Sequence, residues 1–580
     1  MSLFDYNNEE AIGSVFSVDT GTVIVRVEDV EKLRKLQVNH LVVLRSAKAG
    51  QHLIGLITKI MRKTLSEPID GDSAEEFQEG VATVENVIRV TLIGTLIDLV
   101  GTVANAFRRT LETVPEIDAK CFVLEGDRLT GFMRAISKGK EGSSPLSLGK
   151  YTLDENAEAW LDGNRFFQRH AVIVGSTGSG KSWSVARILE QVAGLPNANA
   201  ILFDIHGEYR PITGKGIQHL KIAGPGDLAG VRGLEDGILF LPYWLLTYEE
   251  MLALLLDRSD QNAPNQAMLF ARAVNEAKRE TLVKEKKSEV LANFTIDSPV
   301  PYSLDKIITA LKTIDEEMVQ GAKTEKQGPF FGKLTRFIQR LEAKRSDRRL
   351  GFLFGIGDAG MSYDWMPTFC QRLLCSTGQQ DKGGVKIIDF SEVPSDILPL
   401  IAGLVGCLVF SVQQWTEKDC QHPIALLCDE AHLYIPEGSR TNAVDDAGLR
   451  SFERIAKEGR KYGVGLVVIS QRPAEVNRTI LSQCNNFIAL RLTNADDQAV
   501  VRRLLPDSLG GFSDLLPILD IGEALVVGDA SIIPSRIRIE PPKIKPESAT
   551  IDFWDVWSKS EVPKGIEEAV EALRRQSKGN

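Results

Sequence analysis

The stretch that decides the fold is Ala171-Val172-Ile173-Val174-Gly175-Ser176-Thr177-Gly178-Ser179-Gly180-Lys181-Ser182. Four consecutive apolar residues predict a buried strand, and the eight residues after them match the pattern G-x-x-x-x-G-K-[ST]. The run from Trp183 to Val192 then has a pattern compatible with a helix. A strand, a glycine-rich turn and a helix in this order predict a phosphate-binding loop rather than an accidental Gly/Ser-rich turn.

Each residue type in this loop has a physical reason to be there. The glycines allow backbone N–H groups to turn toward phosphate oxygens. Lys181 is expected to neutralise the β- and γ-phosphates, and the Ser182 hydroxyl to coordinate Mg²⁺ at the positive end of a helix. The predicted cofactors are therefore ATP and Mg²⁺. The residues expected to bind the nucleotide are Gly175, Ser176, Thr177, Gly178, Ser179, Gly180, Lys181 and Ser182.

Composition sets limits on the class of protein. The 580 residues suffice for two to four domains, and a hydrophobic content of 43% supports a sizeable core. The net charge of −10 gives the chain as a whole no basic surface for nucleic acid or a membrane, although a locally basic channel stays compatible with it.

The sequence favours a reducing cytoplasm. Residues 1–10 contain no apolar signal region, and the seven cysteines form no metal-type pairs. The longest apolar run, Ile397 to Val412, contains Pro399 and is shorter than the roughly 20 residues of a membrane span. We predict that this run is a buried helix and that the protein has no membrane partner.

The pattern of the chain predicts an α/β fold in five parts. Short β-rich runs separated by turns predict a β-barrel over 1–145, with a flexible boundary at Ser137 to Pro145. Strands that are apolar on both faces alternate with helices, which predicts a mainly parallel sheet covered on both sides. The expected parts are the barrel (1–145), the first part of the core (146–244), a mainly helical insertion (245–380), the second part of the core (381–540) and a docking tail (541–580). The aromatic cluster of the tail docks on a partner such as a neighbouring subunit or packs on the chain's own core.

A second strand supplies the acid pair that ATP hydrolysis needs. The strand Ile424 to Cys428 ends in Asp429, expected to support Mg²⁺, and Glu430, expected to orient and polarise the attacking water. Gln471 follows the next strand, where its amide could sense the γ-phosphate, position water or only bind a loop. Because ligands bind where the ends of parallel strands meet, the topology favours a role for Gln471 at the site.

Three other groups of polar residues have more than one interpretation. The basic face of the helix Arg450 to Tyr462 is a solvated surface, a source of an arginine finger for a neighbour, or a contact to a phosphate backbone; Arg454 and Arg460 are the finger candidates. Asp204, His206 and Glu208 form a weak metal signature, so we favour a role around the nucleotide or in coupling. A basic cluster is either a solvated helix or a DNA-facing surface; it comprises Lys333, Arg336, Arg340, Lys344, Arg345, Arg348 and Arg349.

With these motifs in order, the chain resembles the HerA family of hexameric DNA translocases, in the HerA/FtsK division of P-loop motors. The resemblance covers most of the chain. It rests on an N-terminal β-barrel followed by a set of motifs in a fixed order. The motifs that carry it are 169–182, Asp204-Ile205-His206-Gly207-Glu208-Tyr209, Leu241-Pro242-Tyr243-Trp244, Asp429-Glu430-Ala431-His432, Glu458-Gly459-Arg460-Lys461-Tyr462-Gly463 and Ser470-Gln471-Arg472-Pro473.

The resemblance implies more than the motifs themselves. It implies a RecA-like ATPase core with a helical insertion, preceded by a small β-barrel called the HAS domain, which helps to assemble a homo-hexamer around double-stranded DNA. An arginine of the next subunit would complete each ATP site and maps to Arg454 or Arg460, and Arg169 matches a second basic residue near the nucleotide. The family's partners are a NurA-like nuclease in end resection or, in antiviral defence, a sirtuin-like NAD-consuming enzyme or another nuclease.

The predicted function is therefore an ATPase motor that translocates double-stranded DNA in end processing or antiviral defence. The alternative is an ATP-dependent ring scaffold that assembles and activates a partner effector with little translocation. The intact Lys181, Asp429 and Glu430 favour the motor over the scaffold.

Overall fold

The structure is a computed structural model. It describes residues 4, 6–48, 50–65, 83–97, 106–137, 145–152, 154–228, 233–320, 324–355, 357–375, 384–438, 443–504, 510–531, 533–548, 551–559 and 564–577. Apart from its two end residues, the flexible boundary predicted at 137–145 lies outside the described residues. The chain divides into a barrel unit, Met1–Phe166 with Asn486–Glu540, and a P-loop unit, Phe167–Asn485 with Pro541–Asn580.

The barrel unit begins with a closed antiparallel barrel. Its strand order within the described residues is β2-β1-β7-β3-β4-β5, and pairing of β2 with β5 closes the ring. The predicted N-terminal β-barrel is therefore confirmed. Its strands are β1 (Gly13–Val18), β2 (Thr22–Arg26), β3 (Leu41–Arg45), β4 (Gln51–Leu65), β5 (Thr83–Ile97) and β7 (Lys120–Val123), with β6 (Ala106–Arg108) beside β5.

The barrel unit also contains an antiparallel series of strands formed from distant parts of the sequence. The order is β19-β20-β21-β8-β9, so strands that precede the P-loop pair with strands near residue 540. These strands are β8 (Leu146–Tyr151), β9 (Asp154–Leu161), β19 (Asn486–Leu490), β20 (Glu523–Gly528) and β21 (Ser535–Ile539). Residues 486–540, expected to continue the core, thus group with residues 1–166, and the five-part division stays a prediction.

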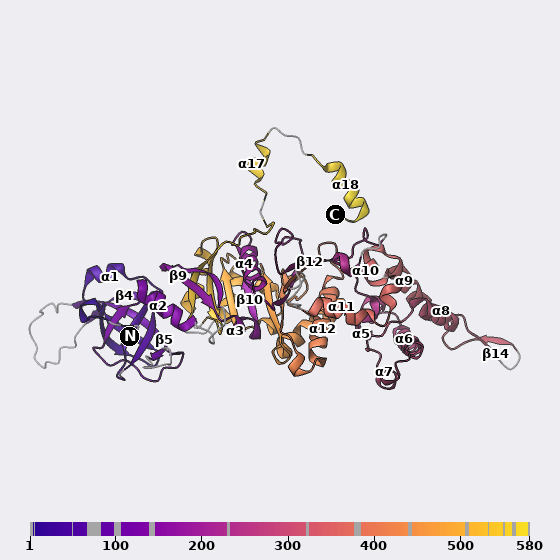
Figure 1. Cartoon of the computed structure of the whole chain (residues 1–580), viewed down its shortest axis with the longest axis horizontal. Coiled ribbons are helices and arrows are strands. Elements are labelled where there is room, and N and C mark those ends of the chain that lie inside the picture. The colour runs from indigo at the N-terminus through magenta and orange to yellow at the C-terminus, as the bar shows by residue number, and fades with distance from the viewer. Residues whose placement is uncertain are drawn as a thin grey trace, which may run out of the picture. The chain divides into compact units, whose positions relative to one another are not determined.

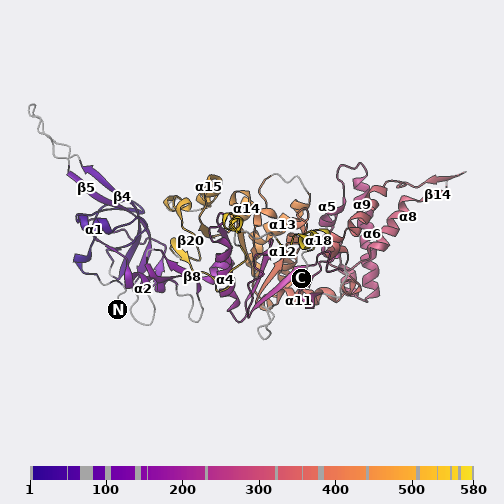
Figure 2. The ribbon, with the colours of Figure 1, turned by 90° about the horizontal axis from the view of Figure 1, so that it is seen from above.

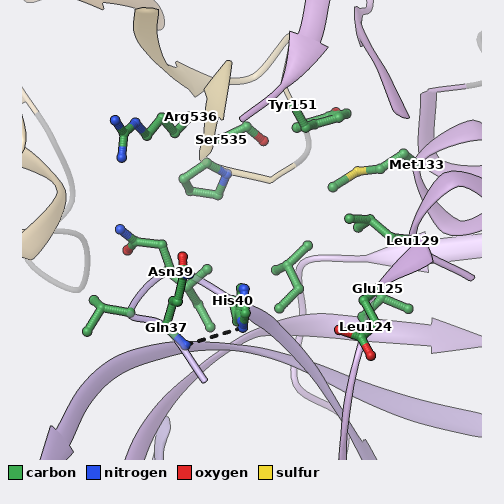
Figure 3. A pocket seen from close by; sticks show the side chains of 14 residues that line it. Gln37, Asn39, His40, Leu124, Glu125, Leu129, Met133, Tyr151, Ser535 and Arg536 are labelled. Carbon is green, nitrogen blue, oxygen red and sulfur yellow. Dashed lines mark hydrogen bonds between the residues drawn. The ribbon is translucent and has the colours of Figure 1, made fainter. Parts of the chain in front are cut away.

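A cavity of about 120 Å³ lies in the barrel unit. In Figure 3, Tyr151 and Ser535 line one side of it, and Asn39 and His40 line the other. Burial lowers the pKa of His40, and this effect is opposed by the nearby carboxylate of Glu125. The cavity is lined by residues of the barrel unit alone, whereas the ATP-binding motifs belong to the P-loop unit.

The P-loop unit is built on a parallel sheet. The strand order is β13-β12-β16-β11-β17-β18-β10, and each strand runs parallel to its neighbours in this order. The strands β10, β11, β17 and β18 are buried at every position, as expected for a sheet covered on both faces. The α/β fold is confirmed. The bounds are β10 (Ala171–Val174), β11 (Asn199–Asp204), β12 (Ile217–Ile222), β13 (Ile238–Leu239), β16 (Gly384–Asp389), β17 (Ile424–Cys428) and β18 (Val464–Ser470).

Two helices of this unit pack closely against each other, α12 (Leu398–Trp415) and α13 (Ala443–Glu458). A Cβ atom on Gly403 would lie 2.4 Å from the Cα of Gly448, so the contact requires glycine. In the described part of the chain, α12 is the one helix long and apolar enough to cross a membrane, and 72% of it is buried inside the fold. This burial agrees with the helix predicted from 397 to 412.

The region expected to be a mainly helical insertion is helical in the structure. Figure 2 shows α6, α8 and α9 together, with β14 extending beyond them. The strand β14 (Met318–Gln320) forms an exposed hairpin with β15 (Glu325–Gln327). The helices are α5 (Tyr248–Leu255), α6 (Ala263–Lys284), α7 (Ser288–Asn293), α8 (Leu304–Asp315), α9 (Thr335–Ser346), α10 (Gly351–Phe354) and α11 (Trp365–Leu374).

The C-terminal tail leaves its apolar side chains exposed. It contains α17 (Phe553–Trp557) and α18 (Ile566–Arg575), and neither helix has a buried residue. The side chains of Trp554 and Trp557 are 81% and 70% exposed. In the described residues, the aromatic cluster is therefore not packed into this chain's own core.

Candidate ATPase site

The phosphate-binding loop joins β10 to α4 (Lys181–Ala193), as Figure 1 shows at the centre of the ribbon. Gly178 has a φ of 74° and Gly180 a φ of 101°, which is the left-handed region that residues with a side chain rarely adopt. Lys181 and Ser182 lie in the first turn of α4 and are both buried. The local sequence thus places the backbone N–H groups of a first helical turn, a cation and a hydroxyl at one helix N-terminus.

Lys181 contacts both members of the acid pair. Its Nζ lies 2.9 Å from Oδ1 of Asp429 and 2.8 Å from Oε1 of Glu430, and none of the three side chains is more than 5% exposed. Burial alone would lower the pKa of Lys181, but the two carboxylates outweigh burial and raise it. The ammonium group is therefore charged at neutral pH, as neutralisation of a phosphate requires.

Glu430 is held in an unusual conformation. Its φ of 45° lies in the left-handed region, which is uncommon for a residue with a side chain and typical of functional sites. Burial alone would raise the pKa of Glu430, but Lys181 and the amide of Gln471 outweigh burial and lower it. Nδ1 of His432 lies 3.4 Å from its second oxygen, Oε2. The carboxylate is thus ionised and able to accept a hydrogen bond from a water molecule.

Gln471 connects the phosphate-binding loop to Glu430. Its Nε2 donates to Oε1 of Glu430 at 2.6 Å, and its Oε1 accepts from the Thr177 hydroxyl at 2.6 Å. The strand β18, which Gln471 follows, lies between β10 and β17 in the sheet. This order explains how one amide reaches both motifs. The sequence suggested Gln471 as a sensor, but it contained no signal for the contact with Thr177.

Glu208 also lies at the site, next to Ser182. Asp204 ends β11 and accepts hydrogen bonds from the backbone N–H groups of Gly207, Glu208 and Tyr209, so it shapes this loop. The Glu208 carboxylate then accepts a hydrogen bond from the Ser182 hydroxyl at 2.9 Å. Burial raises the pKa of Asp204 to about 7 and also raises the pKa of Glu208. His206, the third member of the weak metal signature, is exposed.

The oxygen donors at the site fit Mg²⁺ that arrives with a nucleotide. Among the described residues, no group of three or more His, Cys, Asp or Glu side chains could hold a metal ion. Mg²⁺ is usually bound by one or two carboxylates together with substrate phosphates and waters, so a complete protein cage is not needed. Two side chains carry oxygen ligands of the required kind: Ser182, which follows Lys181 in α4, and Asp429, which accepts a hydrogen bond from Lys181.

The structure does not bring the three candidate arginines to this chain's own site. Arg169 precedes β10, at the end of the strand opposite to the phosphate-binding loop. Arg454 donates to Oε1 of Gln414 at 2.9 Å and lies 4.7 Å above the ring of Phe410. Arg460 is exposed and precedes β18, whereas Gln471 follows that strand. Their assignment to an ATP site stays a prediction about an assembly.

The basic cluster on α9 and the turn after it is partly paired within the chain. Arg340 contacts Asp257 at 3.0 Å, Arg345 contacts Asp305 at 2.5 Å, and Arg349 contacts Asp347 at 2.7 Å. These ion pairs favour the solvated-helix interpretation for the three arginines involved.

Comparison with known proteins agrees with these motifs. The family model described as the central domain of helicase HerA matches residues 146–359. The DNA double-strand break repair helicase HerA of Pyrococcus furiosus is 26% identical over 431 residues, 69% of this chain and 70% of that protein. HerA of Sulfurisphaera tokodaii is 24% identical over 534 residues, 90% of this chain and 92% of its own length.

These comparisons confirm the resemblance of the chain to the HerA family. Together with the complete loop and acid pair, this similarity identifies the chain as a P-loop ATPase. Solved structures with a similar fold include VirB4 of Thermoanaerobacter pseudethanolicus, at 18% identity and a TM-score of 0.43 over 70% of this chain and 98% of that one. The plasmid coupling protein TrwB in complex with ADP and Mg²⁺ has a TM-score of 0.41 at 12% identity, over 66% of this chain and 88% of that one.

Proposed function

We propose that this P-loop ATPase is the subunit of a hexameric motor that uses Mg²⁺ and ATP to translocate double-stranded DNA through a central channel. The observation that carries the proposal is the contact of Lys181 with Asp429 and Glu430, which Gln471 joins to the loop. These are the groups that phosphoryl transfer to water requires. Relatives with matching sequences are named DNA double-strand break repair helicases.

The position of the arginines supports an assembly of several subunits. Arg454 and Arg460 lie on the surface and away from Lys181, so neither completes the site of its own chain. In a ring, an arginine from one subunit stabilises the charge that develops at the neighbour's ATP. The exposed apolar side chains of α17 and α18 support an assembly as well, since such surfaces commonly mark protein contacts.

The resemblance to the HerA family supports a proposal for the cellular role. We place the motor in the cytoplasm, where it works with a NurA-like nuclease in DNA end processing, or with a sirtuin-like or other effector in antiviral defence. The net charge of −10 requires that the positive charge for DNA be concentrated in the channel.

The test of the motor is the ATPase rate with and without duplex DNA at several salt concentrations. We expect DNA to stimulate hydrolysis, most strongly at low salt, because contacts to phosphates weaken as salt rises. Hydrolysis that duplex DNA does not stimulate, even at low salt, would favour the alternative of a ring scaffold for a partner effector.

A mixing experiment tests whether an arginine acts between subunits. Arg454→Ala and Arg460→Ala proteins are each mixed with Lys181→Ala protein before assembly. If one arginine acts in trans, the mixture hydrolyses ATP faster than either protein alone, because Lys181→Ala subunits still provide the arginine. Lys457→Ala, in α13 together with Arg454, is the control. If neither mixture hydrolyses ATP faster than its separate proteins, the arginine finger is a residue other than Arg454 and Arg460.

A further inference from the structure

A proline-rich segment follows the last strand of the barrel unit and belongs to the P-loop unit. We call residues 541–548, Pro-Pro-Lys-Ile-Lys-Pro-Glu-Ser, the strap. Pro542 and Pro546 are buried, whereas Lys543, Lys545 and Glu547 are exposed. Because proline fixes φ, a segment with three prolines is extended and comparatively stiff. Two buried prolines therefore hold the strap in a defined path.

The strap runs along α4 toward the ATP site. The Lys543 backbone N–H donates to Oε2 of Glu190 at 3.3 Å, and its ammonium lies 3.4 Å from Oε1 of the same carboxylate. Two residues later, the Lys545 ammonium lies 5.1 Å from the ring centroid of Trp183. Glu190 is near the end of α4, and Trp183 directly follows Ser182. Successive strap residues thus approach the phosphate-binding loop.

The strap then binds the loop that carries Glu208. The backbone N–H of Glu547 donates to the carbonyl oxygen of Glu208 at 2.7 Å. The carboxylate of the same Glu208 accepts the hydrogen bond of the Ser182 hydroxyl at 2.9 Å. One residue therefore connects the strap to the hydroxyl that is expected to coordinate Mg²⁺.

The bond from Ser182 to Glu208 determines which way the hydroxyl oxygen faces. A serine hydroxyl has one hydrogen and two lone pairs. When Glu208 accepts the hydrogen, the lone pairs point away from Glu208 and are available to a cation. An ionised carboxylate is well suited to accept the Ser182 hydrogen, because a hydrogen bond to a charged group is shorter and stronger than one between neutral groups.

We propose that Glu208 is a positioning residue for the metal-binding hydroxyl of Ser182, and that the strap holds Glu208 in place through the backbone of Glu547. The inference rests on the proposed use of Mg²⁺ with ATP at this site. It gives Glu208, for which the sequence indicated only a role around the nucleotide or in coupling, a defined task, and it adds a segment beyond residue 540 that none of the motifs contains. The strap acts on the binding of Mg²⁺ and ATP, not on the attacking water.

The experiment compares Glu547→Pro with Glu547→Ala in the full-length protein. Proline removes the N–H that binds Glu208, whereas alanine keeps it and removes only an exposed side chain. For Glu547→Pro we expect a rise of about threefold to tenfold in the Mg²⁺ concentration for half-maximal binding of a non-hydrolysable ATP analogue, the effect of losing one hydrogen bond. The Mg²⁺ concentration for half-maximal ATPase activity should rise by the same factor. The kcat at saturating Mg²⁺ should stay within about twofold. Equal Mg²⁺ dependence in the two variants overturns the role of the strap.

A second pair of variants tests Glu208 itself and decides the matter if Glu547→Pro does not fold. Glu208→Gln keeps an oxygen that accepts the Ser182 hydrogen, whereas Glu208→Ala removes it. We expect the Mg²⁺ requirement to rise more in the alanine than in the glutamine variant, with Lys559→Ala, an exposed residue outside the strap, unchanged. Equal Mg²⁺ dependence of wild type and Glu208→Ala refutes the positioning role. Absence of Mg²⁺-dependent hydrolysis in the wild type would instead contradict the proposed function.

Discussion

Replacing Gln471 by alanine removes a side chain that touches both Thr177 of the phosphate-binding loop and the catalytic carboxylate of Glu430. The variant loses the 2.6 Å bond to Glu430 and the 2.6 Å bond from Thr177. It leaves the contact of Lys181 with Glu430 in place. We therefore expect nucleotide binding to survive and turnover to fall.

The size of the effect follows from the kind of bond that is lost. A hydrogen bond to a charged group contributes about 1.5–3 kcal/mol, and the bond to Thr177, between neutral groups, about 0.5–1.5 kcal/mol. Because Lys181 still orients Glu430, the lower part of the first range applies to the bond between Gln471 and the Glu430 carboxylate. At about 1.4 kcal/mol for each factor of ten, we expect kcat to fall roughly 10-fold to 30-fold.

Steady-state kinetics with ATP as the varied substrate measures the effect. The exposed Gln483→Ala is the matched control, and Thr177→Val removes only the second bond. Combined in a double-mutant cycle, Thr177→Val and Gln471→Ala should show coupling of about 0.5–1.5 kcal/mol. A Gln471→Ala protein with an unchanged kcat, or one in which only KM rises, would refute a role in orienting Glu430.

Two further predictions concern stability. In Gly448→Ala the new Cβ would lie 2.0 Å from the carbonyl oxygen of Pro399, so we expect a loss of about 1–3 kcal/mol and a lower thermal midpoint. For Asp204, the pKa of about 7 in the folded protein exceeds the ordinary 3.8, so the folded state favours the neutral acid. Its contribution is most favourable at low pH and declines as pH rises through about 7. Relative to Asp204→Asn, which does not ionise, the wild type should lose about 1–3 kcal/mol between pH 5 and pH 8, and parallel pH profiles would contradict the shift.

The parts of the site that sequence could predict are those encoded by adjacent residues. The loop 175–182 and the pair Asp429-Glu430 each follow a buried strand, and that local context fixes their chemistry. The contacts of Thr177 with Gln471 and of Ser182 with Glu208 could not be predicted, because they depend on side-chain directions across different strands. The Gly207 that follows Asp204 is compatible with a turn, but nothing local indicates the partner of Glu208.

The grouping of the strands shows the same limit for the fold. The run at 486–490 is apolar at most positions, as a core strand is, yet its established partner β20 is antiparallel and both strands belong to the barrel unit. The apolar composition of a strand predicts that it is buried, but not whether its neighbour runs parallel or antiparallel to it. The proposed arginine finger, Arg454 or Arg460, shows the same limit. A residue that acts on a neighbouring subunit leaves no sign of that role in the geometry of a single chain.

We infer that Glu430 orients the attacking water in a site built by Lys181 and Gln471. The most direct measurement is the ATPase rate of Glu430→Gln, together with its affinity for ATP. Glutamine has nearly the same shape but no charge to polarise water. We predict ATP binding within a few-fold of the wild type and a kcat reduced about 100-fold or more. Hydrolysis by Glu430→Gln at the wild-type rate would contradict the account.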